Sequence, residues 1–510
     1  MRQMRNLSGL AARISGLAMI AVAIAIPGYA DAATCDSLKS LSLTEAAVDS
    51  VQVVAAGAFT QPGGRAGRGG NAFADLPAFC RVTLTARPSS DSDIKIEVWL
   101  PAENWNSKYQ AVGNGAWTGA IGYAAMADAL RRGYATSSTD TGHVGGSASF
   151  AMNHPEKAID FAYRSEHEMV LKSKALINAF YGSAPKYSYW NGCSAGGRQA
   201  LMEAQRFPAD FDGIIAGSPG SDWAGRSAQA VRINQILESD AAKLTPTHLQ
   251  ALHTAVVAAC DANDGLKDGL ISKPESCKFD PKTIQCKNGD APDCLSAAQV
   301  ETVKAIYSPL KVGARETAGL AYGSELNWTD LGWSVSARAT GLDHYRYLVY
   351  NDPEWTIAKF NPATDPAKLD EGPSGQMNAL NPDLKAFFAR GGKLLTYHGW
   401  ADPQISGLNA TTYYEQVVKA AGGAGKISGN YRLFMAPGMA HCGGGEGPND
   451  FDKIGTLEQW VEKGTAPSMI VASHSKGGAV DRTRPLCPYP QVATYKGTGS
   501  IDEAANFVCK

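Results

Sequence analysis

The stretch Trp-Asn-Gly-Cys-Ser-Ala-Gly-Gly-Arg at residues 190–198 constrains the fold of this 510-residue chain more than any other segment. A short aromatic run at residues 187–190 predicts a strand before it, and the helix-forming residues 198–207 predict a helix after it. Between them lies the pattern G-x-S-x-G, a sharp strand-to-helix turn that projects a serine hydroxyl out of a sheet. Ser194 would then lie at a helix N-terminus, where free N–H groups stabilise negative charge. The alternative is a glycine-rich turn with an inert serine.

Strand and helix patterns alternate on both sides of this turn. Residues 93–100 alternate apolar and polar side chains, as a half-buried strand does. Further strands are predicted at residues 109–112, 134–138, 213–216, 393–397 and 431–435, and helices at residues 123–132, 161–181, 411–421 and 451–463. This alternation indicates βαβ units and therefore an α/β fold with a mostly parallel sheet.

The alternation stops between residues 223 and 386. This region contains four cysteines, many turn residues and, among its aromatic residues, Trp328, Trp333 and Trp355. The whole chain is also longer than one typical hydrophobic core requires. We therefore expect residues 33–222 and 387–510 to form the catalytic domain, with residues 223–386 inserted as a lid domain.

The N-terminus has the pattern of an export signal. Arg2, Arg5 and Arg13 precede an apolar run at residues 17–26, and Ala-Asp-Ala at residues 30–32 offers a cleavage site. The apolar run is short for a membrane anchor. We expect residues 1–32 to be a signal peptide and the mature protein to be secreted or periplasmic, with no membrane contact after cleavage. The net charge of −2, without a basic stripe, argues against a nucleic-acid partner.

All ten cysteines follow this segment, and their number is even. In an oxidising compartment this predicts five disulfides, although the count alone leaves the pairing open. No C-x-x-C pair occurs, which argues against a cysteine metal site.

A serine nucleophile needs a base and an acid that orients the base. In α/β-hydrolases the acid and then the base follow the serine along the chain. His441 lies in a loop directly after the strand at residues 431–435, where the base is expected, and Asp402 follows the strand at 393–397 and fits the acid. His398 is a second candidate base, but its position four residues before Asp402 favours a structural role beside the acid loop.

The oxyanion hole should use two backbone N–H groups. One belongs to Ala195, the residue after the nucleophile, and the other should come from the loop after an early strand. Residues 113–116 form that loop, and Gly115 and Ala116 are both candidates for the second donor.

Cys193 and Cys442 each adjoin a proposed catalytic residue. If His441 takes a proton from Ser194, the two loops must meet, and a disulfide between these cysteines would tie them together. The alternative is a pair of buried free thiols, which an oxidising compartment disfavours.

The loop Asp-Ala-Asn-Asp-Gly-Leu-Lys-Asp-Gly-Leu at residues 261–270 is the second notable cluster. Three carboxylates in a glycine-containing loop, with carbonyls between them, suit Ca²⁺. The spacing differs from an EF-hand, and an acidic surface turn is the alternative. Cys260 and Cys277 flank the loop and could close it.

These segments resemble the tannase and feruloyl esterase family along essentially the whole mature chain. The motifs are GCSAGGR, HGWADP, PGMAHC, DANDGLKDGL and RTRPLCPYP. The resemblance implies an α/β-hydrolase core with a large inserted lid domain, and a catalytic triad of Ser194, Asp402 and His441. It also implies a structural lid Ca²⁺, with no organic cofactor. The implied ligands are the side chains of Asp261, Asp264 and Asp268 and the carbonyls of Leu266 and Leu270.

The resemblance further implies the disulfide pairing, namely Cys35–Cys80, Cys193–Cys442, Cys260–Cys277, Cys286–Cys294 and Cys487–Cys509. Two features depart from the family pattern. The oxyanion loop reads GNGAW where relatives are richer in glycine, and the lid after Cys294 is shorter than in the family's terephthalate monoester hydrolase.

Together these features predict a serine carboxylesterase acting on esters of hydroxycinnamic or gallic acids through an acyl-enzyme. Its partner would be a small aromatic ester, free or attached to a plant polysaccharide or polyphenol. One alternative is a phthalate or terephthalate monoester hydrolase. Another is an inactive phenolic- or carbohydrate-binding protein. Lid aromatics such as Trp328 and Trp333 are candidate substrate contacts.

Overall fold

The structure, a computed structural model, describes residues 34–63, 72–330 and 340–510. The predicted signal peptide and Trp333 lie outside these ranges. Within them, no helix combines the length and apolar character needed to cross a membrane.

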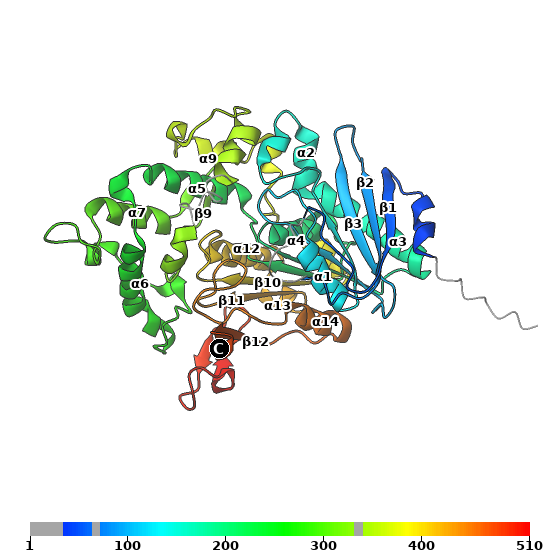
Figure 1. The fold of residues 1–510 in the computed structure, drawn as a ribbon. Coiled ribbons are helices and arrows are strands. Elements are labelled where there is room, and N and C mark those ends of the chain that lie inside the picture. The colour runs from blue at the N-terminus through cyan, green and yellow to red at the C-terminus, as the bar shows by residue number, and fades with distance from the viewer. Residues whose placement is uncertain (1–33, 64–71, 331–339) are drawn as a thin grey trace, which may run out of the picture.

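A nine-stranded mixed sheet forms the centre of the molecule (Figure 1). Its strands, in chain order, are β1 (Ala46–Val54), β2 (Phe79–Ala86), β3 (Ile94–Pro101), β4 (Lys108–Val112), β5 (Ala135–Thr139), β6 (Tyr187–Cys193), β7 (Gly213–Gly217), β10 (Lys393–Gly399) and β11 (Tyr431–Ala436). The spatial order is β1-β2-β3-β5-β4-β6-β7-β10-β11. The pairs from β1 to β5 are antiparallel, and all pairs from β5 to β11 are parallel.

The parallel strands are largely buried on both faces because helices cover both. Ile214 and Ile215 are neighbours on β7, yet they belong to different apolar clusters, since successive side chains of a strand point to opposite faces. Helices α3 (Ser165–Tyr181), α4 (Ala195–Arg206) and α12 (Gly407–Ala420) contribute to the first cluster, and α14 (Lys453–Lys463) to the second. A shorter helix, α1 (Tyr123–Arg131), packs near β3, β4 and β5. The parallel half of the sheet is thus the rigid platform of the fold.

Residues between β7 and β10 contribute no strand to this sheet and form a separate mass beside it (Figure 1). Its main elements are α5 (Trp223–Ile236), α6 (Pro246–Cys260), α7 (Ala297–Tyr307), the small hairpin β8 (Leu310–Val312) and β9 (Arg315–Thr317), and α9 (Asp365–Lys368). This region, called the lid below, has two apolar clusters of its own.

Trp328 belongs to the interior of the lid. Its side chain is fully buried against Tyr307, and its indole N–H donates to Ser324 Oγ at 2.9 Å. The suggestion that Trp328 contacts substrate is therefore wrong for this structure, because its apolar surface is used in the lid core.

The C-terminal segment adds two small hairpins. They consist of β12 (Ile470–Lys476) with β13 (Ala479–Leu486), and β14 (Ala493–Tyr495) with β15 (Phe507–Cys509). Remaining short helices are α2 (Pro155–Ile159), α10 (Gly372–Gly375), α11 (Lys385–Ala389) and α13 (Ala424–Ile427). All ten cysteines are paired, as Cys35–Cys80, Cys193–Cys442, Cys260–Cys277, Cys286–Cys294 and Cys487–Cys509. These are the five pairs that the family resemblance implies.

Candidate active site

Ser194 stands at the junction of β6 and α4, in a backbone conformation that few side-chain-bearing residues adopt. Its φ and ψ are 64° and −120°. Its N–H donates to the Gly217 carbonyl at 2.9 Å, and its own carbonyl accepts from the N–H groups of Arg198 and Gly220. The strained turn predicted from G-x-S-x-G is therefore present, and its neighbours hold it from both sides.

Close backbone packing explains two of the surrounding glycines. A Cβ at Gly197 would lie 2.3 Å from the Gly217 carbonyl oxygen, and a Cβ at Gly113 would lie 2.5 Å from Gly196 Cα. Only glycine permits approaches this close. The loop at residues 113–116 consequently lies directly against the N-terminus of α4.

This contact assembles the candidate oxyanion hole. The Gly196 N–H donates to the Asn114 carbonyl at 2.8 Å, which fixes the loop beside Ala195. Ala116 has a positive φ of 43°, so the chain turns at this point. Within the described residues, the N–H groups of Ala195, Gly115 and Ala116 have no hydrogen-bond acceptor. Both candidates for the second donor thus remain.

A buried polar network behind this loop was not foreseen from the sequence. Gln199 Oε1 accepts from the Asn114 N–H at 2.9 Å, and Gln199 Nε2 donates to Asn114 Oδ1 at 3.1 Å. The same Nε2 also donates to Glu166, a buried residue of α3. Burial raises the pKa of Glu166 to about 7, against the opposing charge of Arg198. The nucleophile helix therefore holds the oxyanion loop through a side-chain amide.

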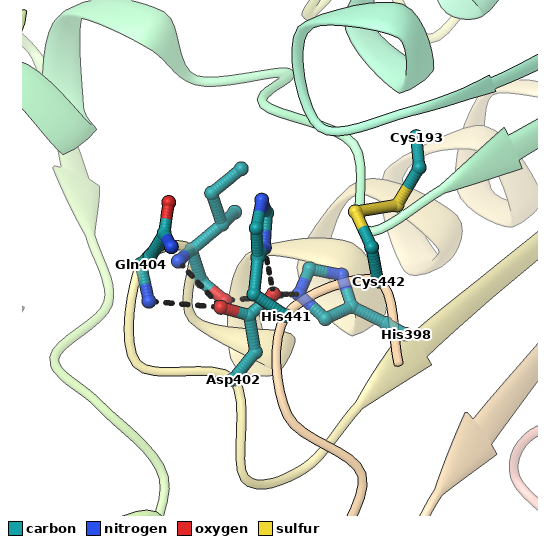
Figure 2. Close-up of a disulfide and its surroundings, with 7 residues drawn as sticks. Cys193, His398, Asp402, Gln404, His441 and Cys442 are labelled. Atoms are coloured by element: carbon teal, nitrogen blue, oxygen red, sulfur yellow. Dashed lines mark hydrogen bonds and ion pairs between the residues drawn. A yellow bond between two sulfur atoms is a disulfide. The ribbon is translucent and has the colours of Figure 1, made fainter. Parts of the chain in front are cut away.

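Asp402 and His441 are brought together at the ends of β10 and β11 (Figure 2). His441 Nδ1 donates to Asp402 Oδ2 at 2.8 Å, and the Asp402 side chain is fully buried. Burial alone would raise the pKa of Asp402, but the charge of His441 and the hydrogen bonds from His398 and His441 hold it well below its usual range. With its proton on Nδ1, His441 presents Nε2 as a proton acceptor.

The rest of the acid loop orients the second carboxylate oxygen. Asp402 Oδ1 accepts from the N–H groups of Gln404 and Ile405, at 2.8 and 3.0 Å. His398 is fully buried, and its Nε2 lies 2.9 Å from the Ile405 carbonyl oxygen and 3.2 Å from Asp402 Oδ2. His398 thus supports the acid loop, as its position in the sequence suggests.

A disulfide joins the nucleophile turn to the loop of His441. Cys193 and Cys442, whose Cα atoms are 6.0 Å apart, are the immediate neighbours of Ser194 and His441 (Figure 2). The Ser194 hydroxyl forms no hydrogen bond within the described part of the chain, so the bridge is the direct link between these two loops. The arrangement can support nucleophilic attack by Ser194 with His441 as base.

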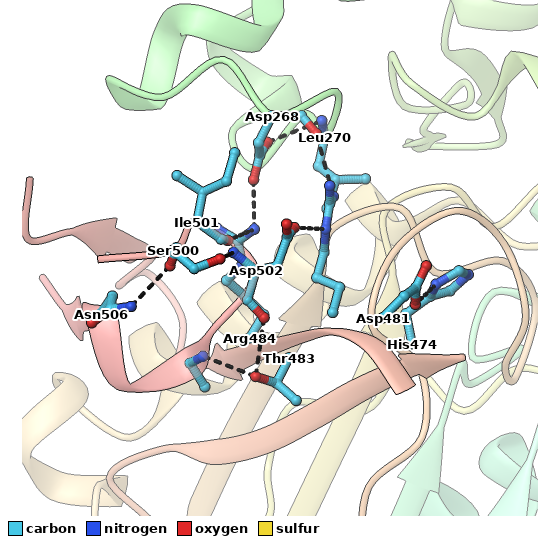
Figure 3. Close-up of polar contacts among 12 residues, drawn as sticks. Asp268, Leu270, His474, Asp481, Thr483, Arg484, Ser500, Ile501, Asp502 and Asn506 are labelled. Carbon is cyan, nitrogen blue, oxygen red and sulfur yellow. Dashed lines mark hydrogen bonds and ion pairs between the residues drawn. The ribbon is translucent and has the colours of Figure 1, made fainter. Parts of the chain in front are cut away.

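The acidic loop of the lid faces the C-terminal hairpin (Figure 3). Asp268 Oδ2 pairs with Arg484 of β13 at 2.6 Å, and both side chains are almost fully buried. Asp261 accepts from the N–H groups of Asp268 and Gly269. Burial raises the pKa of Asp264, and the negative charges of Asp268 and Asp261 add to this effect.

The five oxygens expected to bind Ca²⁺ therefore belong to one compact loop, and their chemistry suits a hard cation. In the arrangement seen, however, the carboxylates face backbone N–H groups and Arg484 rather than one another. Across the described ranges, no three acidic, histidine or cysteine side chains converge closely enough to form a metal site.

Comparison with known proteins places these features in context. The family model described as tannase and feruloyl esterase matches residues 80–343 and 360–510. An uncharacterized esterase of Xanthomonas campestris pv. campestris is 37% identical, with 99% of this chain and 96% of the relative covered. A probable feruloyl esterase B-2 of Neosartorya fischeri is 33% identical, with 98% of this chain and 99% of the relative covered.

This chain is similar in structure to the crystal structure of feruloyl esterase B from Aspergillus oryzae, with 93% of this chain and 99% of the Aspergillus chain covered. The TM-score is 0.86 and the sequence identity 32%. The prediction of an α/β-hydrolase core is thereby confirmed.

The pKa of Glu166 leads to a pH-dependent stability prediction. Its folded value of about 7 exceeds the ordinary value of 4.5, so its ionisation opposes folding as the pH rises from about 4.5 to 7. Glu166→Gln should remove this penalty. Relative to wild type, the variant should gain about 3 kcal/mol of unfolding free energy between pH 4.5 and pH 8, measured by urea denaturation. Glu103→Gln, at an exposed position, is the control, and an equal difference at both pH values would contradict the prediction.

The disulfide beside the triad should matter for catalysis more than for folding. Replacing Cys193 and Cys442 together by serine should lower kcat for ester hydrolysis at least about ten-fold, because small misplacements of reacting groups are costly. The melting temperature should show that the core remains folded. The matched control replaces Cys286 and Cys294, a bridge within the lid. A variant lacking Cys193–Cys442 with wild-type kcat would show that the bridge does not position the base.

Proposed function

Because this chain belongs to the tannase and feruloyl esterase family, we propose that it hydrolyses esters of hydroxycinnamic or gallic acids through a serine acyl-enzyme. Its relatives are carboxylic ester hydrolases, and so is this protein. The observation that carries the proposed mechanism is the 2.8 Å contact of His441 with buried Asp402. The disulfide Cys193–Cys442 joins the loop of His441 to the Ser194 turn.

In the first half of the reaction, Ser194 Oγ attacks the ester carbonyl carbon while its proton passes to His441 Nε2. The carbonyl oxygen becomes an oxyanion, which the N–H groups of Ala195 and of Gly115 or Ala116 stabilise. Asp402 stabilises the imidazolium. The tetrahedral intermediate then collapses, His441 gives the proton to the departing alcohol oxygen, and the acid remains bound to Ser194.

In the second half, a water molecule gives a proton to His441 as its oxygen attacks the acyl carbon. Collapse of this second tetrahedral intermediate breaks the bond to Ser194 Oγ, which recovers the proton from His441. The aromatic acid is released and the enzyme is regenerated.

Arg226 supports a second candidate substrate class. The guanidinium of this α5 residue forms no hydrogen bond or ion pair within the described residues, and its Nη1 is buried. It lines a cavity that also includes Gln229 and Thr317 of the lid and Gln404 of the acid loop. An unpaired guanidinium beside the acid loop suits a substrate with a free carboxylate. A phthalate or terephthalate monoester hydrolase is therefore the alternative activity.

Export to an oxidising compartment is part of the proposal. Five disulfides are typical of secreted or periplasmic proteins, because cytosolic reductants keep thiols reduced.

We also propose that the lid loop binds a structural Ca²⁺ through the side chains of Asp261, Asp264 and Asp268 and the carbonyls of Leu266 and Leu270. The ion would neutralise carboxylates that otherwise repel one another, and it would take no part in ester chemistry. Its binding requires the carboxylates to turn toward one point, away from their present N–H and guanidinium partners.

Substrate preference should be measured on methyl ferulate, caffeate, p-coumarate and gallate, and on a terephthalate monoester. We expect the highest kcat/KM for a hydroxycinnamate or gallate ester, and a loss of about 10³-fold or more in Ser194→Ala. A fluorophosphonate should label the wild type and leave Ser194→Ala unlabelled. A preference for the terephthalate monoester would favour the alternative activity. Absence of both labelling and turnover would favour a binding protein.

The calcium proposal predicts that chelation destabilises the protein. Excess EDTA should lower the melting temperature and added Ca²⁺ should restore it, because a ligand bound only to the folded state stabilises that state. Asp264→Ala should have the melting temperature of the EDTA-treated wild type, and added Ca²⁺ should not raise it. Asp290→Ala, at an exposed lid position, serves as control. Identical melting curves with and without EDTA, and no calcium by elemental analysis, would assign the loop as an acidic surface turn.

A further inference from the structure

A cluster of charged side chains links the lid to the loop that carries His441. His253 lies on α6 of the lid and is buried. Its Nδ1 is 2.8 Å from Glu325 Oε2, within the lid, and its Nε2 is 3.2 Å from Glu446 Oε2. Glu446 follows His441 by five residues in the sequence. The imidazole therefore lies between one carboxylate of the lid and one of the base loop.

The lid side of this link is rigid. Glu325 is fully buried, and its Oε1 accepts from the Tyr307 hydroxyl at 2.6 Å and from the Gly323 N–H at 2.7 Å. Burial lowers the pKa of His253, but the two carboxylates outweigh this effect and raise it to about 9. At neutral pH both ring nitrogens thus carry protons: Nδ1 donates to Glu325, and the imidazolium forms an ion pair with Glu446.

The base loop is a narrow closed turn. The Ala440 N–H donates to the Gly444 carbonyl at 3.0 Å, and the Glu446 N–H donates to the Gly438 carbonyl at 2.9 Å. Gly443, Gly444 and Gly445 all have positive φ, and glycine gives a chain unusual conformational freedom. Without anchors on both sides, His441 at the tip of this turn would have several accessible positions.

The two sides of the turn have different anchors. Cys442 is bonded to Cys193, and Asp402 receives the His441 ring, so one side is tied to the catalytic core. Glu446, on the returning side, has its carboxylate on His253 of the lid. The lid loop also meets this turn directly, because a Cβ at Gly438 would lie 2.7 Å from Leu270 Cδ2.

We propose that His253 and Glu446 are positioning residues through which the lid holds the His441 loop in its reactive arrangement. This inference rests on the proposed function, because it requires His441 to act as the base. Other titratable groups near the pair are Tyr307 and Glu325 in the lid, and His474 of β12, whose charge helps to lower the pKa of Glu446. Neither positioning residue needs to touch the substrate.

Glu446 is the better residue to change, because its side chain is half exposed, whereas loss of His253 would leave Glu325 buried without its cationic partner. Glu446→Ala should lower kcat for p-nitrophenyl acetate about ten-fold, with KM changed less than two-fold, because the loop loses one anchor. The fluorophosphonate labelling rate of Ser194 should fall by a similar factor. Glu446→Gln, which still accepts from His253, should retain kcat within about three-fold of wild type.

Asp450→Ala is the matched control. It removes an exposed carboxylate of the same charge, nine residues after His441 in the sequence, whose side chain forms no hydrogen bond or ion pair among the described residues. It should leave kcat and the labelling rate unchanged. In a His253→Gln background, the further change Glu446→Ala should lower kcat less than two-fold. The effects of two substitutions in one interacting pair are not additive, because the first already weakens the contact.

The outcomes separate the two proposals. If the wild type hydrolyses the ester and is labelled, but Glu446→Ala behaves like Asp450→Ala, the positioning role is overturned and the proposed function stands. The positioning role would also be overturned if Glu446→Ala lowered kcat by the same factor in the wild-type and His253→Gln backgrounds. A wild type that shows neither hydrolysis nor labelling would overturn the proposed function and this inference with it.

Discussion

The carbonyl oxygen of Gly217 accepts a hydrogen bond from the Ser194 N–H, and a Cβ at Gly197 would lie 2.3 Å from that same oxygen. The end of β7 thus fixes both the nucleophile turn and the first turn of α4. A second close approach, between Gly113 and Gly196, places the oxyanion loop on the same helix end. These backbone contacts define where negative charge can be stabilised, and every side chain of the site is arranged around them.

Short-range sequence patterns predicted most strands of the central sheet and the loops that carry Asp402 and His441. The strand before the Ser194 turn was predicted from a short aromatic run and the strand at residues 93–100 from alternating apolar residues, and the positions of Asp402 and His441 follow from the loops after β10 and β11. Strand β2 was missed, although Cys80, Val82 and Leu84 alternate with polar residues and could have indicated it. The predicted helix at residues 161–181 begins instead at Ser165, after a π-helical turn at Asp160–Arg164.

Long-range polar contacts had no comparable signal. Asn114 and Gln199 are separated by 85 residues, and a lone amide in either segment gives no indication of its partner. The same holds for His253 and Glu446, which belong to the lid and to the base loop. Such pairs are set by how whole elements pack, so a single sequence cannot specify them. The disulfides differ because an even number of cysteines in an oxidising compartment predicts that all of them are paired, and the family resemblance implies which pairs form.

The bridge Cys193–Cys442 closes a covalent ring, since its two cysteines are 249 positions apart and the entire lid lies between them. A protease that cuts one peptide bond in a lid loop would therefore open the ring without separating the pieces that carry Ser194 and His441. The nicked protein would still hold its nucleophile and base on one covalently connected molecule. The export proposed above would expose the lid loops to proteases, and the bridge would then keep the proposed nucleophile and base together after a cut in one of these loops.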